Sequence, residues 1–155
     1  MQQDAREAYQ RTQVTTAAPQ NLRLMLIQGA IRVAKQTIDH WQNNRIEQGT
    51  ESLIHCRQIV TELVGSVNPQ QNSISKSTCD LYLFIFQSLT IANQVRDITR
   101  IEDVIRILEV EQETWQQICE QLSETASEQT TRHAPGQITT SDPQPSSTTS
   151  ISFNA

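Results

Sequence analysis

The sequence is short of the residues that break helices. Its 155 residues include only four glycines and five prolines, and three of the prolines follow residue 130. Glycine and proline are the least favourable residues inside a helix, so a stretch of about 120 residues nearly free of them favours an all-α fold. The length suits one compact domain with some additional chain.

Positive charge and long apolar runs are also scarce. The net charge is −5 and Lys and Arg nowhere cluster, which argues against a nucleic-acid-binding surface. No apolar run approaches the roughly 20 residues that a membrane-spanning helix needs. The opening residues, Met-Gln-Gln-Asp, form neither a basic nor an apolar leader region. The sequence therefore predicts a cytoplasmic protein with no nucleic-acid partner and no membrane insertion.

Residues typical of catalytic and metal sites are few and scattered. Cys56, Cys79 and Cys119 are widely spaced within apolar patterns, as expected for reduced thiols that serve as small core side chains. The pair Glu51 and His55 has no second copy with which to complete a metal site between helices. Neither a Gly-rich phosphate loop nor a nucleophile elbow is present. We therefore predict no enzyme, no metal site and no cofactor.

Apolar residues recur at helical spacing in four segments. The first segment begins at Pro19, where the missing backbone N–H costs nothing, and continues to about Trp41. Its N-cap would be Ala18, which is a weak cap. The second segment begins near Gly49, with Thr50 as a candidate cap, and ends before the sequence Asn-Pro at 68–69.

The third segment begins between Ser73 and Ser77 and continues to about Ile98. The fourth continues from about Arg100 to Leu122 along a heptad seam. Together the segments predict an elongated antiparallel four-helix bundle over residues 1–123, in which residues 1–16 form a short N-terminal strap or helix. Residues 124–155 are rich in Ser, Thr, Gln and Pro and cannot bury enough apolar area to offset their ordering entropy, so we expect a disordered C-terminal tail.

The centre of the third segment, residues 81–86, is apolar in every direction (Leu-Tyr-Leu-Phe-Ile-Phe). A helix of this kind must be enclosed on all sides or covered by something else. Two interpretations stay open at this point. Phe84 and Phe86 either cap the core beneath the N-terminal strap, or they form a surface that binds a partner, most simply an amphipathic helix.

Several short motifs follow one another along the chain. They are Tyr9 to Pro19, Leu22 to Ile31, Ile59 to Val67, Leu81 to Phe84, Ala92-Asn93 with Asp97, Ile101 to Val104, and Glu113 to Trp115. In this order they resemble the FliS family of flagellar proteins, and the likeness covers about residues 5–122. The chain departs from the family pattern at Ile27, where an aromatic residue is common, and at Gln87-Ser88, which replace a frequent arginine pair.

The resemblance implies a chaperone that binds the disordered C-terminal segment of flagellin, prevents its premature polymerisation and assists its export. It suggests a groove that is lined or underlain by Leu22, Leu26, Ile27, Ala30, Leu81, Phe84 and Ile85. Phe84 would be the central anchor, since aromatic residues dominate such interfaces. Tyr9 and Val14 would lie on the strap, which covers the groove when flagellin is absent and contacts a component of the flagellar export gate.

The competing interpretation is a generic helical adaptor or a self-associating bundle with a different helical client. Such a protein would use the same apolar face symmetrically. We would then expect a concentration-dependent homodimer when the chain is free of client.

Overall fold

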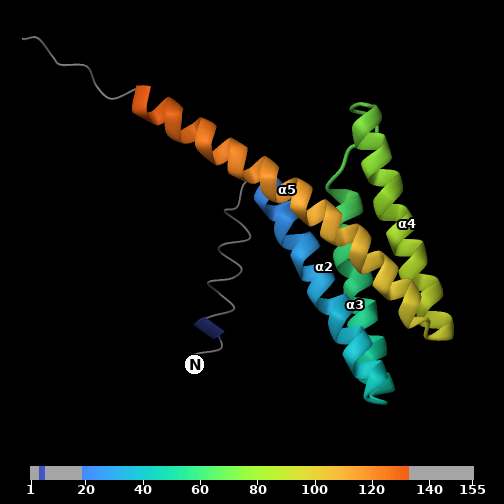
Figure 1. Cartoon of the computed structure of the whole chain (residues 1–155). Coiled ribbons are helices and arrows are strands. Elements are labelled where there is room, and N and C mark those ends of the chain that lie inside the picture. Colours follow the sequence, from blue (N-terminus) through green and yellow to red (C-terminus); the bar gives the residue numbers. More distant parts are fainter. Residues whose placement is uncertain (1–3, 6–18, 133–155) are drawn as a thin grey trace, which may run out of the picture.

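The computed structural model describes residues 4–5 and 19–132, which hold the long helices α2 (Pro19–Gln42), α3 (Ile46–Gly65), α4 (Ser73–Val95) and α5 (Ile98–Arg132) (Figure 1). Short loops join these helices, and the described residues contain no strand. The predicted all-α bundle is therefore confirmed. α2 begins at Pro19, as its position in the sequence predicts.

Consecutive helices run antiparallel. Near the start of α2, the Arg23 guanidinium donates a hydrogen bond of 2.8 Å to the carbonyl of Ser66, which follows the last residue of α3. At the other end, Trp41 packs on Gly49 so closely that a Cβ at residue 49 would overlap the indole ring. α2 and α4 lie diagonally across the bundle, and each of them packs against α3 and α5.

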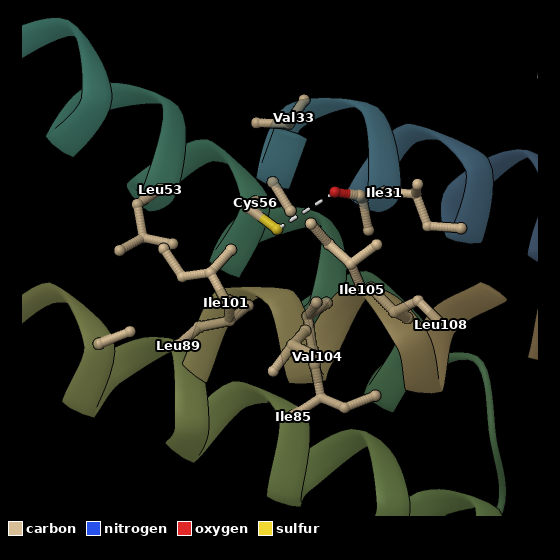
Figure 2. Packing of buried hydrophobic residues seen from close by; sticks show 14 of the residues in the cluster. Ile31, Val33, Leu53, Cys56, Ile85, Leu89, Ile101, Val104, Ile105 and Leu108 are labelled. Atoms are coloured by element: carbon tan, nitrogen blue, oxygen red, sulfur yellow. Dashed lines mark hydrogen bonds between the residues drawn. The ribbon is translucent and has the colours of Figure 1, made fainter. Parts of the chain in front are cut away.

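The core consists of side chains from all four long helices, most of them aliphatic (Figure 2). Cys56 lies among them and its thiol donates to the carbonyl oxygen of Ala30, 3.4 Å away. Burial raises the pKa of Cys56 to about 12, so the thiol stays protonated. Cys79 is also buried, Cys119 is half-buried, and all three are free thiols, as predicted.

The start of α3 differs from the sequence prediction. The helix begins at Ile46, so Gly49 lies inside its first turn and Thr50 is not its cap. The Thr50 hydroxyl instead donates to the Ile46 carbonyl within the helix, over 3.0 Å. The N-cap position is occupied by Arg45, whose side chain makes no capping bond. The sequence offers no capping residue there, so the boundary could not be read from a cap.

The turn between α4 and α5 also differs from expectation, because α4 ends at Val95 and not near Ile98. Arg96 adopts the left-handed conformation with φ 53°, which stops the helix. The carboxylate of Asp97 then accepts a hydrogen bond of 3.1 Å from the backbone N–H of Arg100 and so caps α5. This tight turn places the start of α5 beside the end of α4.

α5 crosses the bundle obliquely and continues past it (Figure 1). The prediction that this helix ends near Leu122 was wrong, since it continues to Arg132. Between the start of α5 and Pro135 the sequence has no glycine or proline, and hydroxyls such as that of Ser123 bond to the carbonyl four residues earlier. Nothing local therefore ends the helix. Residues 120–129 and 131–132 are exposed, and the rest of the predicted tail, residues 133–155, lies outside the described residues.

Candidate functional site

Exposed apolar side chains gather on the outer face of α4. Phe84, Ile91 and Val95 are 53%, 43% and 68% exposed. They follow one another at steps of seven and four residues, so they form a single line along the helix. Tyr82 and Ile85, which face the other way, are fully buried. The apolar segment of the third helix is thus divided between core and surface, and we call the line of Phe84, Ile91 and Val95 the α4 stripe.

The two phenylalanines of this segment have different surroundings. Phe86 is half-buried against the core, and the Arg57 guanidinium lies over its ring, 4.9 Å from the ring centre. Phe86 therefore caps the core, as one of the two interpretations held. Phe84 has more than half of its surface exposed within the described part of the chain, so its ring is available to a partner.

A small pocket opens beside Phe84, between α4 and the first turns of α5. Its volume is about 210 Å³, and it is lined by Phe84, Ser88, Asp97, Thr99, Arg100, Asp103, Val104 and Ile107. Phe84, Val104 and Ile107 supply apolar walls, while the other lining residues are polar. The pocket can accept one side chain of a partner that lies along the α4 stripe.

The structure divides the seven residues of the expected groove into three groups. Ile27, Ala30 and Ile85 are fully buried, so they can only support a binding surface from beneath. Leu22, Leu26 and Leu81 are half-buried, and Phe84 alone is largely exposed; these seven residues come from α2 and α4. Because α2 and α4 lie diagonally, the seven residues do not face one another across a single groove.

Polar contacts tie the four helices together at the end of the bundle where α2 begins. The Arg23 guanidinium lies over the Trp115 ring, 4.3 Å from its centre. The carboxylate oxygen Oε2 of Glu111 accepts hydrogen bonds from Trp115 Nε1 (3.3 Å) and from the Tyr82 hydroxyl (3.0 Å). With the bond from Arg23 to Ser66, side chains from α2, α4 and α5 and the end of α3 are joined.

Tyr82 donates its hydroxyl proton to a carboxylate, and the electrostatics favour that arrangement. Burial raises the pKa of the Tyr82 phenol, and the negative charge of Glu111 raises it further. The hydroxyl therefore remains protonated at any physiological pH. The sequence predicted neither this contact nor that of Arg23 with Trp115; only the spacing of Glu111 and Trp115, four residues apart on one helix face, could have indicated part of the network.

Other parts of the described chain offer weaker candidates for a site. A broad, open hollow of about 800 Å³ lies between α2 and α5, with mostly polar lining residues, and the Lys35–Glu109 ion pair spans these two helices. Within the described residues, no three His, Cys, Asp or Glu side chains come together as metal ligands. No described helix is long and apolar enough to cross a membrane. Tyr9 and Val14, the expected strap residues, lie outside the described residues.

Comparison with known proteins gives matches over most of the chain. The family described as flagellar protein FliS matches residues 1–122. A relative from Bacillus subtilis (strain 168), the flagellar secretion chaperone FliS, is 28% identical over 131 residues, which cover 84% of this chain and 93% of the relative. The family match extends through the whole of α2, α3 and α4 and most of α5. The chain therefore belongs to the FliS family of flagellar proteins.

Proposed function

We propose that this protein is a cytoplasmic flagellar secretion chaperone that binds flagellin and delivers it for export. The observation that carries the proposal is the α4 stripe, an exposed apolar line on a member of the FliS family. The curated relative is named as a flagellar secretion chaperone. An apolar stripe of this length on a small bundle suits the apolar face of a partner helix.

The client is the disordered C-terminal segment of flagellin, as the resemblance to the family implies. The bound segment would form helices joined by extended pieces, and in this state flagellin could not assemble into filament. Coupled folding costs the client several kcal/mol of ordering, which keeps a large interface reversible. This suits a chaperone that must release its client at the export gate.

Phe84 is the central anchor of this surface, with the pocket beside it and Ile91 and Val95 further along α4. On α4, Leu81 contributes from a half-buried position and Ile85 supports the surface from the core. The expected residues of α2, namely Leu22, Leu26, Ile27 and Ala30, lie diagonally across the bundle, so a client would have to extend around it to reach Leu22 and Leu26. The N-terminal strap, with Tyr9 and Val14, would add a contact to the export gate and would compete with the client for the surface. Client binding would then shift the population from chains with the strap on the surface to chains with the strap displaced.

Titration calorimetry with the C-terminal segment of flagellin from the same organism tests the proposal. We expect saturable 1:1 binding by the full chain and loss of binding by Phe84→Glu, because a buried carboxylate at the centre of an apolar contact is unpaired. Val110→Glu is the matched control, since Val110 is 64% exposed on α5 and lies outside the stripe and the pocket. Helical circular dichroism should be the same for all three proteins.

Two results would contradict the proposal. Equal loss of binding in the Phe84 and Val110 variants would mean that any added negative charge weakens the complex. No binding by the unsubstituted chain would leave a helical adaptor with another client, or a bundle that pairs with a second copy of itself. Light scattering at increasing protein concentration separates these last two, because only self-association through the stripe gives a dimer that Phe84→Glu abolishes.

A further inference from the structure

We propose that the pocket beside Phe84 recognises a carboxamide, the side chain of a glutamine or asparagine in the client. The inference rests on the proposed function, since it takes the α4 stripe to be the client-binding surface. It goes further by assigning one pocket and one kind of side chain to the recognition.

Ser88 supplies the first hydrogen-bonding group of the pocket. The residue is only 4% exposed and lines the pocket, and its hydroxyl has no hydrogen-bond partner within the described part of the chain. Other hydroxyls of α4 behave differently: those of Ser77, Thr78 and Thr90 each donate to the carbonyl four residues earlier. Its oxygen is not one of the fully buried unpaired atoms, so it faces the open pocket. A ligand that displaces water from the pocket must therefore offer this hydroxyl a new hydrogen bond or pay for leaving it without one.

Arg100 supplies a second donor. Its Nε is buried and forms no well-directed hydrogen bond, although Oδ2 of Asp97 lies 3.5 Å away. At that separation the charges attract, but the N–H is not satisfied by a hydrogen bond of normal geometry. The Nε is buried, but the terminal N–H groups of the guanidinium are not, and they form no hydrogen bond within the described residues. They add donor capacity to the pocket that Ser88 also lines.

Acceptors lie at the same rim. Asp97 uses one oxygen to cap α5 and the other in the long contact with Arg100. Asp103 accepts a bond of 2.7 Å from Arg106 through Oδ1, and each carboxylate oxygen has more than one acceptor position. The pocket thus presents donors and acceptors together above the apolar walls of Phe84 and Ile107.

This combination selects among the side chains that a client could insert. A carboxylate would be repelled by Asp97 and Asp103. An ammonium group has donors only, so it would offer no acceptor to the Arg100 guanidinium, and the two carboxylates are already paired with Arg100 and Arg106. A purely apolar side chain would shield the Ser88 hydroxyl from water and leave it without a partner. A carboxamide donates and accepts at once, carries no charge, and has a short apolar stem that can pack on Phe84.

A double-mutant cycle by calorimetry tests the inference with the full chain and the C-terminal flagellin segment. In the client, each glutamine is changed to methionine and each asparagine to leucine, one at a time. In the chaperone, Ser88→Ala removes the hydroxyl, and Thr90→Ala is the matched control because the Thr90 hydroxyl is already bonded to Phe86 within α4. Melting curves check that both variants remain folded.

We expect Ser88→Ala to weaken binding about fivefold, the effect of one neutral hydrogen bond, and Thr90→Ala to leave the affinity unchanged. A single glutamine or asparagine of the client should couple to Ser88, so that changing it weakens the wild-type complex but has much less effect on the Ser88→Ala complex. Additive effects at every client position would overturn the inference. Equal affinities of the Ser88→Ala and wild-type chains would overturn it as well.

The outcome with Phe84→Glu separates this inference from the proposed function. If Phe84→Glu loses the client while Ser88→Ala retains full affinity, the α4 stripe binds flagellin but the pocket does not bind a carboxamide. If Phe84→Glu retains the client, the stripe is not the binding surface and both conclusions fail together.

Discussion

Replacing Tyr82 with phenylalanine should destabilise the bundle through the loss of one hydrogen bond. The Tyr82 ring is fully buried, and its hydroxyl lies 3.0 Å from Oε2 of Glu111. Hydrogen bonds to charged groups contribute about 1.5–3 kcal/mol, and Glu111 is half-buried and keeps its contact with Trp115. We therefore expect a loss of about 1.5 kcal/mol in the free energy of unfolding, from the lower end of that range. For a domain of about 100 residues this lowers Tm by roughly 5–10 °C.

A second variant distinguishes the hydrogen bond from other effects of the substitution. In a Glu111→Ala background the Tyr82 hydroxyl has lost its acceptor, so Tyr82→Phe should then be neutral or slightly stabilising. Urea unfolding of the four proteins of this cycle measures the coupling directly. If Tyr82→Phe costs the same in both backgrounds, the contact with Glu111 does not contribute to stability and the reasoning fails.

The pH dependence of the same variant provides an independent check. Because the pKa of Tyr82 is raised in the folded state, the unfolded chain loses the phenolic proton first, above about pH 10. The folded state then binds more protons than the unfolded state, so stability falls as the pH rises further. Tyr82→Phe should lose this component of alkaline destabilisation. Cys56, whose pKa is raised to about 12, contributes equally to both proteins and cancels in the comparison.

Two further predictions concern packing and chain length. Gly49→Ala should destabilise the bundle by about 1–2 kcal/mol, because its Cβ would overlap the Trp41 ring. Gly65→Ala is the control: its Cβ meets no atom within 4 Å, so the substitution should be neutral or stabilising. Thermal melts compare the two variants, and equal effects would contradict the close packing at Gly49. Truncation after Leu122 should change the free energy of unfolding by less than about 0.5 kcal/mol, because the described residues beyond Leu122 are exposed. Urea unfolding measures the change, and a larger loss would mean that residues after Leu122 pack on the bundle.

The sequence predicted those features of the fold that depend on apolar periodicity and helix breakers. The scarcity of glycine and proline indicated an all-α bundle, and Pro19 marks the first residue of α2. The sequence did not reveal the start of α3, where Arg45 takes the N-cap position without a capping bond, or the end of α5, which no local signal sets before Pro135. Cap residues and breakers can locate a helix boundary only where the chain uses them.

At the candidate site, periodicity predicted an excess of apolar surface on the third helix but not which residues carry it. Phe84 and Phe86 are two residues apart and of the same type, so periodicity could not rank them, and the choice of Phe84 as the central anchor rested on the resemblance to the FliS family. Their difference is tertiary: Arg57 of α3 covers Phe86, and no comparable side chain is recorded over Phe84 within the described residues. Likewise, the residues expected to form one groove divide between α2 and α4, which the order of the helices places on a diagonal.

The pocket beside Phe84 depends most directly on backbone geometry. Its lining residues fall into two groups, on either side of the turn between α4 and α5. They meet because Arg96 adopts a left-handed conformation, which a non-glycine residue rarely does, and because Asp97 restarts the chain as a helix within one residue. If α4 continued to Ile98, as the sequence predicted, Arg100 and Asp103 would lie further from Ser88 along the helix axis. The turn at Arg96 and Asp97 therefore ends α4 earlier than predicted and also brings together the polar groups of the pocket. We propose that the chaperone recognises its client with these groups.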